Sequence, residues 1–514
     1  MPSMDTVVLF YPRGGSAQVI RYLLRELNTR GWTNRLHAGS LGTPGDPSHG
    51  PSFYQGLDLH PYDYNDAFAA FRRGDNPQDT PLPFHPSYED RGDCPDPLFS
   101  AVPPLDADGL TRAWTRHLAA HRSTDTDLVH LHHLSHLQTS VRAAYPNTPV
   151  VTTLHGTELK LIDGMARRVN LAQRLGISLR DLARLLHTDN PHRRAEAQRF
   201  ATAAALDAAD TELLTITAWQ KWLYSPYWLT RLRQAVFHAG HLLAVSEHDR
   251  DLAQRLFDLD HELPVIPNGV DARTFRPQQL DEQHCLEYLR HWLVTDPHGW
   301  APGCVPGSLR YSDTDLRRFR DPAGNLRPLL LWVGRFLDFK RIPVLLRAFT
   351  VARARLDPAP VLLMWGGYPG EYEGQHPFEL AKDLKIEDDV FFAGWRGHDE
   401  LPTGLACADL MVAPAVGEPF GMVYLEAMAC GTPPIATATG GPLHTIVPDG
   451  PRATGWLVKP DDPDDLADTL INALANTAER KRRSANGRSR IETTYSWSRT
   501  ADRYVAAYHQ ASPH

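Results

Sequence analysis

The chain has 514 residues, which is too long for one hydrophobic core and predicts two domains of roughly 200–250 residues each. Hydrophobic residues make up 42% of the chain and charged residues 22%, as in globular rather than disordered proteins. The formal net charge of −8 argues against a nucleic acid as the main partner, because it leaves no strong basic excess.

Short apolar runs that end at Gly or Ser alternate with longer segments of helical period along most of the chain. The runs in the first half cover residues 6–12, 127–133, 149–156, 241–246 and 263–269. Those in the second half cover residues 328–334, 360–367, 389–395, 409–415 and 433–438. They are apolar throughout instead of alternating, which is typical of parallel strands covered by helices on both faces. Two such series predict an α/β protein with two doubly wound, Rossmann-like domains facing a cleft.

The first run leads into a glycine pair and a predicted helix, "YPRGGSAQVIRYLLRELNTRGW" (11–32). Gly14 and Gly15 would let backbone amides approach a phosphate at the start of that helix. The spacing lacks the full GxGxxG pattern, so it does not predict a dinucleotide site, and an ordinary Gly-Gly turn is an alternative. The run before it has five apolar residues and no basic leader, which predicts a first strand rather than a signal peptide.

Histidines gather at the ends of the next two predicted strands. "HLHHLSH" (130–136) could suggest zinc, but it has no neighbouring Cys, Asp or Glu, and His130 and His132 fall on one face of a strand. We therefore expect no metal there. His155, at the end of "TLHG", is either a buried or capping residue or a group that contacts a ligand. "DTD" (125–127) precedes a buried strand and is interpreted as a turn.

Three segments interrupt the alternation of strands and helices. Residues 40–110, rich in Pro, Gly and Asp, predict a long, partly ordered insertion, residues 158–235 a helical one, and residues 279–327 a third. The aromatic stretch 219–229 would pack beneath the helical insertion, in preference to stacking on a sugar or touching a membrane. Residues 165–200 carry eight arginines and three acids, which would suit an anionic ligand or lipid head or simply solvated helix faces.

The second series of strands begins with "LLLWVGRFLDFKRIPVLLRAF" (329–349). Arg335 and Lys340 stand between its strand and a predicted helix, where two cations repel each other unless they share an anion. A diphosphate would neutralise both, and fixed cations would stabilise the charge that it gains on leaving. Two solvated surface cations are the alternative.

"GEPFGMVYLEAMACGTPP" (417–434) lies between two predicted strands and is typical of a loop followed by a helix. The unpaired N–H groups at the start of that helix, which attract phosphate, would belong to Phe420, Gly421, Met422 and Val423. Glu426, one to two turns further on, could accept hydrogen bonds from a ribose diol, and Glu418 from hydroxyls on the other side of the phosphate. The pattern suits a nucleotide sugar; a helix-dipole partner and a solvated acid are the alternative.

These segments resemble the retaining glycosyltransferases of family 4, which have the GT-B fold. "GEPFGMVYLEAMACGTPPIAT" is similar to the E-x7-E segment of that family, and "VGRFLDFKR" to its diphosphate loop. "AVSEHDRDLA" with "VIPNGVDARTFRP" (244–277) resembles the passage between its two domains, and "TLHGTE" (153–158) a strand end that carries a histidine. The resemblance does not extend to the three interrupting segments.

The resemblance implies a role for each matching position. Glu418 would contact hydroxyls of the donor sugar and Glu426 the ribose. Arg335 and Lys340 would hold the diphosphate, helped by the amides of Gly14–Gly15 and of residues 420–423.

It also implies that Trp395 and Arg396 lie near the base and that His155 hydrogen-bonds the transferred sugar from the opposite domain. The leaving phosphate oxygen would take the acceptor proton, so that neither a protein nucleophile nor a metal or other cofactor is required.

The sequence thus predicts an acceptor-side domain over residues 1–270, a nucleotide-sugar domain over 271–494, and a helix over 495–514 that crosses back. A hexose-type sugar would pass from a UDP- or GDP-linked donor to a hydroxyl of a sugar, sugar phosphate, lipid or small natural product. The five cysteines show no CxxC spacing, and no apolar run approaches the roughly 18–20 residues of a membrane span, so we expect a cytoplasmic protein. Peripheral contact with a membrane is left open.

Two other functions fit the same residues. One is another enzyme on this fold, either a nucleotide-sugar epimerase, which needs no acceptor, or a sugar phosphorylase, which uses free phosphate. The other is a non-catalytic sensor that binds a nucleotide sugar without turnover.

Overall fold

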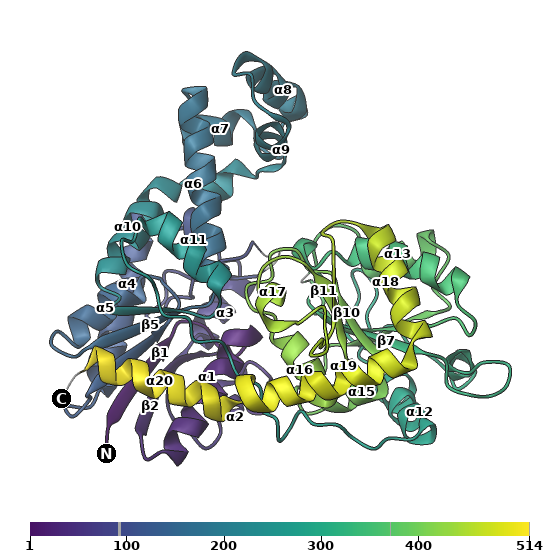
Figure 1. Cartoon of the computed structure of the whole chain (residues 1–514). Helices are drawn as coiled ribbons and strands as arrows, with labels where there is room; N and C mark the ends of the chain where they lie inside the picture. The colour runs from purple at the N-terminus through teal and green to yellow at the C-terminus, as the bar shows by residue number, and fades with distance from the viewer. Residues whose placement is uncertain (91–93, 371, 513–514) are drawn as a thin grey trace. The chain divides into compact units, whose positions relative to one another are not determined.

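The computed structural model describes residues 1–90, 94–370 and 372–512. The chain forms two compact units, Met1–Ile266 with Arg503–His514, and Pro267–Asp502. Each unit contains a six-stranded parallel sheet with helices on its faces (Figure 1). The predicted fold class, two doubly wound α/β domains, is confirmed.

The sheet of the first unit has the strand order β3-β2-β1-β4-β5-β6. Its strands are β1 (Ser3–Val8), β2 (Thr33–Ser40), β3 (Asp58–Asp63), β4 (Leu128–His132), β5 (Val150–Leu154) and β6 (His241–Ala244). The helices around it are α1 (Gly14–Thr29), α2 (Gly50–Phe53), α3 (Asn65–Arg72), α4 (Pro104–His121), α5 (Leu137–Ala144) and α11 (Glu247–Phe257). Strands β1, β4 and β5 are buried along nearly their whole length, as fully apolar runs predict.

Two expectations for this unit were wrong. Residues 40–110 are not a simple insertion, because they supply the edge strand β3 and helices α2 and α3. The apolar run at 263–269 does not form a strand; only Val265 pairs there, in an isolated bridge with Ala244.

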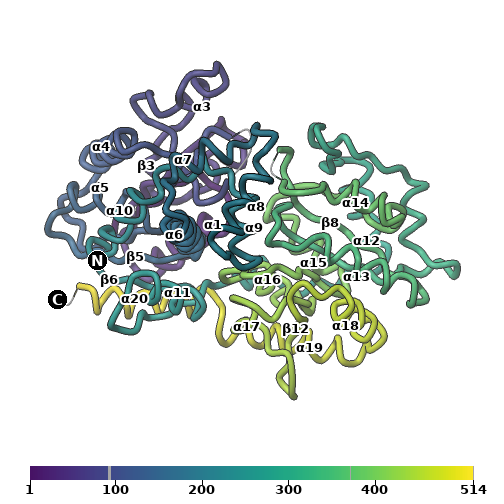
Figure 2. The backbone as a smooth tube through the Cα atoms, turned by 90° about the horizontal axis from the view of Figure 1, so that it is seen from above, coloured from purple at the N-terminus to yellow at the C-terminus, as the bar shows by residue number. Residues whose placement is uncertain are grey.

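The helical segment after β5 forms an arm with its own core. It consists of α6 (Thr157–Leu175), α7 (Leu179–Leu185), α8 (Arg193–Ala203), α9 (Ala208–Ile216), the short turn η2 (Trp219–Trp222) and α10 (Ser225–Phe237). Figure 1 shows α6 leading from the sheet of the first unit to α7, α8 and α9, and Figure 2 views α6 close to end-on. The arm's core includes Leu171, Leu182, Leu186, Leu214 and Trp219.

The aromatic stretch at 219–229 packs inside the protein, as the preferred interpretation predicts. Trp219 and Trp228 are fully buried, and their indole N–H groups donate to the carbonyls of Leu214 (3.1 Å) and Val102 (2.9 Å). Trp222 is half-buried under the Arg168 guanidinium, whose Cζ lies 3.7 Å from the ring centroid.

The sheet of the second unit repeats the topology of the first, in the order β12-β11-β10-β7-β8-β9. Its strands are β7 (Leu329–Gly334), β8 (Val361–Gly366), β9 (Val390–Gly394), β10 (Leu410–Ala413), β11 (Pro434–Thr437) and β12 (Trp456–Val458). Its helices are α12 (Glu282–Arg290), α13 (Ile342–Arg355), α14 (Pro377–Asp383), α15 (Leu401–Cys407), α16 (Met422–Cys430), α17 (Pro442–Thr445), α18 (Pro463–Ala475) and α19 (Thr477–Arg490). Five of the six strands match the predicted runs, whereas β12 was not anticipated.

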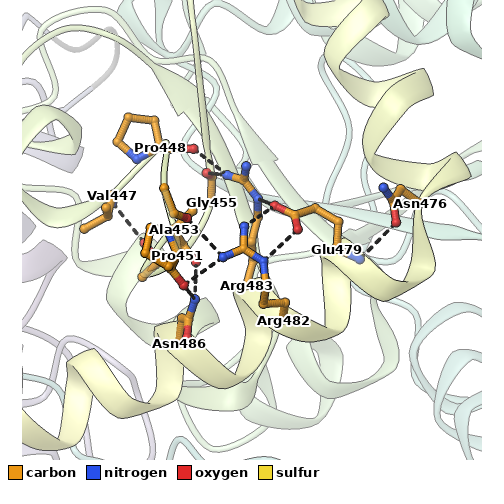
Figure 3. A network of polar contacts seen from close by, with 12 residues as sticks. Val447, Pro448, Pro451, Ala453, Gly455, Asn476, Glu479, Arg482, Arg483 and Asn486 are labelled. Carbon is orange, nitrogen blue, oxygen red and sulfur yellow. Dashed lines mark hydrogen bonds and ion pairs between the residues drawn. The ribbon is translucent and has the colours of Figure 1, made fainter.

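Helix α19 fastens the loop that joins α17 to β12 (Figure 3). Arg483 donates to the carbonyl of Pro448 (2.8 Å), and Arg482 to that of Pro451 (2.7 Å). Glu479 bridges the two guanidinium groups, and its hydrogen bond from Arg482 is the largest cause that lowers its pKa to about 2. The side chain of Asn486 also donates to Pro451 (2.9 Å), so the loop is held by side chains of a single helix.

The last helix, α20 (Trp497–Ala511), has residues in both units. Thr500 donates to the carbonyl of Pro267 in the second unit (3.1 Å), and Tyr508 contacts His130 in the first (2.9 Å). None of the helices in the described part of the chain is long and apolar enough to cross a membrane.

The arm's core predicts a local effect of substituting Trp219. Trp219→Ala should destabilise the arm by about 3–5 kcal/mol, because it leaves a cavity in a small core and removes a buried hydrogen bond. Hydrogen exchange of amides in residues 179–216 should accelerate while that of β1, β4 and β5 stays unchanged. Phe237→Ala, at a side chain that is 86% exposed, is the control. Equal protection of 179–216 in both variants would contradict an independent core.

Candidate functional site

In each sheet the strand order reverses at one point, between β1 and β4 in the first unit and between β7 and β10 in the second. The loops that leave the carboxyl ends of two such strands run in opposite directions, and ligands of doubly wound domains bind between them. In the second unit these loops carry Arg335 and Lys340 after β7, and Glu418 after β10. In the first unit they carry Gly14 and Gly15 after β1, and residues 133–136 after β4.

Lys340 and Glu418 are in direct contact, although 78 residues separate them in the chain. Lys340 Nζ lies 2.5 Å from Glu418 Oε2, and the two side chains are only 14% and 13% exposed. A charge-assisted contact with so little access to water is stronger than a surface ion pair. The two motifs that the sequence singled out therefore meet at one point.

Two glycines hold the backbone of the Glu418 loop. The amide of Gly441 donates to the carbonyl of Glu418 (2.8 Å). A Cβ atom on Gly440 would lie 2.4 Å from that same carbonyl oxygen, and one on Gly441 2.4 Å from the oxygen of Phe420. Only glycine fits at these two positions, which the sequence reasoning missed; the Thr-Gly-Gly sequence that follows β11 is the signal that could have found them.

Helix α16 begins directly after this loop. Gly421 has a φ of 80°, in the left-handed region, and the hydroxyl of Tyr424 ties the first turn to the end of β10 by donating to Ala413 (2.7 Å). The first turn carries no acidic residue. Within the described residues we find no acceptor for the amides of Phe420, Gly421, Met422 and Val423. The predicted helix start is present, and its N–H groups point out of the helix end.

Glu426 is paired with a histidine that the sequence did not single out. It is 5% exposed, and its Oε1 lies 2.9 Å from Nε2 of His398, in the loop after β9. The ring of His398 packs edge-on against Phe275, with centroids 4.7 Å apart. These contacts restrict the direction in which the Glu426 carboxylate points.

Trp395 and Arg396, which also follow β9, have different environments. The guanidinium of Arg396 is fully buried and contacts the carboxylates of Glu400 (3.0 Å) and Asp296 (3.4 Å). Arg396 therefore anchors the segment before β7. Trp395 is 40% exposed, and its ring centroid lies 6.3 Å from that of Tyr368, which is 48% exposed. Tyr368 was not anticipated; the Gly-Gly-Tyr sequence after β8 is its only signal.

In the first unit, α1 starts at Gly14, as predicted. Gly14 has a φ of 71°, both Gly14 and Gly15 are exposed, and a Cβ on Gly14 would touch no atom within 4 Å. Arg13, just before them, contacts the buried carboxylate of Asp96 at 3.1 Å. The amides at this helix start are accessible, and their proposed contact with phosphate stays a prediction.

His155 lies at the end of β5 within a group of buried histidines. Its Nε2 is 2.9 Å from Nδ1 of His132, and its backbone N–H donates to Glu158 Oε1 (2.9 Å). The other carboxylate oxygen, Oε2, is 3.0 Å from Nδ1 of His133. Burial, and after it the neighbouring histidines, lower the pKa of His155 well below its ordinary value. His155 is therefore a neutral hydrogen-bonding group near neutral pH.

His130 extends the same group toward α20. Its Nδ1 lies 2.9 Å from the hydroxyl of Tyr508, and its Nε2 lies 2.8 Å from Oγ1 of Thr153. Its ring centroid is 4.2 Å from that of His132, and burial lowers the pKa of His130 to about 3. No group of three or more His, Cys, Asp or Glu side chains in the described residues is arranged to hold a metal ion.

Two family models match this chain. The model described as glycosyltransferase family 4 matches residues 13–274, and that of the glycosyl transferases group 1 matches residues 314–490. The chain belongs to glycosyltransferase family 4. The predicted family is thereby confirmed, and its members are enzymes that transfer sugars.

Curated relatives include several proteins named D-inositol 3-phosphate glycosyltransferase. The one from Salinispora arenicola is 38% identical over 286 residues, which cover 54% of this chain and 56% of that protein. The one from Frankia alni is 37% identical over 292 residues, covering 55% and 61%. The chain spans about half the length of the curated relatives it matches.

Solved structures of similar fold cover nearly the whole chain. Sucrose-phosphate synthase from Thermosynechococcus elongatus has a TM-score of 0.60 at 19% identity, covering 99% of each chain. Anabaena Alr3699/HepE, solved in complex with UDP and glucose, has a TM-score of 0.57 at 12% identity, covering 99% of this chain and 100% of that one. At such identities the likeness concerns the fold, which is GT-B.

The contact between Lys340 and Glu418 predicts strong coupling between the two side chains. Lys340→Met alone should destabilise the protein more than the double variant with Glu418→Gln, because the single change removes the cation that contacts a partly buried carboxylate. A double-mutant cycle by chemical denaturation should give a coupling free energy of about 1–3 kcal/mol. Effects that add within about 0.3 kcal/mol would show that the contact contributes nothing.

The buried histidines predict lability in acid. The pKa of His130 is about 3 in the folded protein and about 6.5 in the unfolded chain, so below pH 6.5 the unfolded state binds more protons. The free energy of unfolding should therefore fall as the pH drops, by up to about 1.4 kcal/mol per pH unit for each such histidine. Denaturation series between about pH 7.5 and about pH 5 should show a shallower slope for His130→Gln. The exposed His238→Gln is the control, and identical slopes for the two variants would refute this prediction.

Proposed function

We propose that the protein is a retaining glycosyltransferase that moves a hexose-type sugar from a nucleotide-diphosphate sugar to a hydroxyl acceptor. The observation that carries the proposal is the contact of Lys340 with Glu418 beside the start of α16. It brings together a cation for phosphate, a carboxylate for hydroxyls and a helix N-terminus at the switch point of one sheet. Membership of glycosyltransferase family 4 supports it independently.

The diphosphate would take the place of Glu418 as the partner of Lys340. Without a donor, each charge of the pair neutralises the other. When the diphosphate arrives, Lys340 and Arg335 would turn to it, together with the amides of residues 420–423. Glu418 would then be released to accept hydrogen bonds from hydroxyls of the donor sugar. The exchange keeps a half-buried lysine paired in both states.

The nucleoside end would lie against α16 and the ends of β8 and β9. Glu426, held by His398 through one oxygen, would accept from the ribose diol with the other. Trp395 and Tyr368 are exposed aromatic side chains suited to stacking on a base. Since the guanidinium of Arg396 is committed to Glu400 and Asp296, we assign it an anchoring role and assign the contact with the base to Trp395.

Chemistry would require no nucleophile from the protein. The bond between the anomeric carbon and the phosphate oxygen breaks, and the acceptor hydroxyl attacks from the same face, so that the configuration is retained. The departing phosphate oxygen takes the proton of that hydroxyl. Lys340 and Arg335 would stabilise the charge that develops on the diphosphate, and His155 would hydrogen-bond the transferred sugar. The cations and helix amides supply the neutralisation for which other enzymes use a divalent metal.

The first substrates to test follow from the relatives. UDP-linked hexoses are the first donors, because Anabaena Alr3699/HepE was solved with UDP, and GDP-linked hexoses come next. A phosphorylated cyclic polyol is the first acceptor, because the curated relatives are named for D-inositol 3-phosphate. The correct donor should raise the unfolding temperature, since a ligand at about 100 times its Kd stabilises by about 2.7 kcal/mol.

Lys340→Ala should lower kcat much more than it weakens binding of the free nucleoside, because the lysine contacts only the phosphates. Removing one such charge costs roughly 100-fold or more in kcat. Steady-state rates and calorimetric titration with nucleoside and nucleoside diphosphate measure the two effects. Lys382→Ala, at an exposed lysine on α14, is the matched control and should leave both unchanged.

Four results would contradict the proposal. Equal loss of nucleoside binding and turnover in Lys340→Ala would exclude a role at the transition state. Inversion of the anomeric configuration would exclude the front-face reaction. Turnover that disappears in EDTA and returns with Mg²⁺ would exclude neutralisation by Lys340 and Arg335 alone. Conversion of the donor without any acceptor would favour an epimerase.

A further inference from the structure

Of the buried, hydrogen-bonded histidines of the first unit, the proposed reaction uses His155 and gives His132 no role. We propose that His132 is a positioning residue: it donates through Nδ1–H to Nε2 of His155, and thereby fixes the tautomer in which His155 presents Nδ1–H to the transferred sugar. The observation behind this is the 2.9 Å contact between the two nitrogens, at the adjacent ends of β4 and β5. The inference rests on the proposed function for the identity of the ligand, but not for the tautomer.

Each of the two rings carries a single proton. His132 and His155 are both buried, and burial is the largest cause that lowers the pKa of each well below its ordinary value. A neutral imidazole has one donor and one acceptor nitrogen, so the direction of the shared hydrogen bond determines where both protons lie. Two arrangements are possible. They differ in whether a proton lies on Nε2 of His132 and on Nδ1 of His155, the two nitrogens outside the shared hydrogen bond.

In the first arrangement His132 donates, and its Nε2 is a bare acceptor. In the second His155 donates, and His132 carries its proton on Nε2. In the structure this Nε2 is buried and has no hydrogen-bond partner among the described residues. A buried N–H without a partner is the rarer defect in proteins, since an unpaired donor is tolerated less often than an unpaired acceptor. The burial of His132 therefore selects the first arrangement.

The neighbouring His133 follows the same pattern. Its Nδ1 faces Oε2 of Glu158, which accepts, and its Nε2 is likewise buried without a partner among the described residues. Oε1 of Glu158 accepts the backbone N–H of His155, so this carboxylate also fixes the strand end that carries the ring. On His133 too, the nitrogen that faces a hydrogen-bond acceptor is Nδ1, and the nitrogen without a partner among the described residues is Nε2.

The second ring nitrogen of His155 is then the one that can serve a ligand. His155 keeps 9% of its surface exposed, and within the described residues no hydrogen bond to its Nδ1 is found. With the proton on Nδ1, His155 is a neutral donor suited to a sugar hydroxyl oxygen. With the proton on Nε2 it would offer only an acceptor. The ring of His132 packs against that of His130, with ring centroids 4.2 Å apart. His130 is in turn held by its contact with the hydroxyl of Tyr508.

The tautomer can be measured in the full-length protein without any substrate. Long-range ¹H–¹⁵N correlation spectra of protein labelled at its histidine rings distinguish protonated from bare nitrogens. Signals of the two rings are assigned from the variants His132→Leu and His155→Phe. We expect His155 to carry its proton on Nδ1 in the parent protein. Loss of that preference is expected in His132→Leu, which lacks the donor. A proton on Nε2 of His155 in the parent would overturn the inference.

Kinetic measurements on two His132 variants distinguish a role in positioning His155 from a role in packing alone. Asn and Leu have nearly the same shape, but only the Asn amide can replace the Nδ1–H donor. We expect kcat/KM for the donor sugar to fall roughly tenfold in His132→Leu and to stay within about threefold in His132→Asn. Affinity for the nucleoside diphosphate alone should stay unchanged in both. The unfolding temperatures of both variants are measured alongside.

Equal losses of kcat/KM in the Asn and Leu variants would show that His132 acts only through packing, and would overturn the inference. If the parent protein turns over no nucleotide sugar, the proposed function fails. The NMR experiment still decides whether His132 sets the tautomer of His155.

Discussion

The contact between Lys340 and Glu418 is the constraint around which the second unit is built. A lysine and a glutamate 2.5 Å apart, both largely shielded from water, are stable only while their loops hold them together. The Glu418 loop is held by the side chain of Thr439 and by the backbone of Gly441, where Gly440 and Gly441 allow an approach that any side chain would block. The contact between Lys340 and Glu418 therefore depends on the backbone that supports the Glu418 loop.

Support for this contact extends back to α19. Arg490 donates to the carbonyls of His444 and Thr445, at the end of α17, which begins at the supporting glycines. Arg482 and Arg483 hold the loop that follows. Helix α19 thus supports the segment that follows the Glu418 loop in space, and most of these hydrogen bonds run from a guanidinium to a backbone carbonyl. Such bonds fix the loop whatever its side chains are, and on the proposed function this leaves Glu418 and Lys340 to bind the donor.

The sequence predicted the continuously apolar strands and the charged motifs better than it predicted the other strands and the supporting contacts. Strands β7–β11 are continuous apolar runs because helices cover both faces, and each was recognised from that pattern. Strand β3 lies at a sheet edge and is mostly exposed, so it has no apolar run and was taken for part of an insertion. Position in the sheet is not the deciding factor, because the edge strands β6 and β9 were recognised from their apolar runs, whereas the interior strand β2 was missed, since its sequence TNRLHAGS is not continuously apolar.

In the candidate site, too, some features could be predicted from the sequence and others could not. Lys340, Glu418 and the start of α16 could be predicted because motif spacing and helix-start chemistry are local. The pairing of Glu426 with His398, and the burial of Arg396 against Glu400 and Asp296, could not. Those contacts depend on which loops the sheet brings together, and nothing in the separate segments specifies it. Arg396 is an example of a role that the separate segments could not settle. The resemblance places it near the base, whereas its guanidinium is fully buried.

The two sheets have the same topology but carry groups of different electrostatic character at the carboxyl ends of their strands. The second unit presents charged groups, and it pairs Lys340 with Glu418 so that neither is buried alone. The first unit presents His155, whose buried neighbours keep it neutral and direct its hydrogen bond. An anionic diphosphate requires fixed charge, whereas a neutral hydroxyl is recognised by a neutral donor without the desolvation cost of an ion. On the proposed function, this difference assigns the charge of the diphosphate mainly to the second unit, while the sugar hydroxyls are shared between Glu418 there and the neutral donor His155 of the first unit.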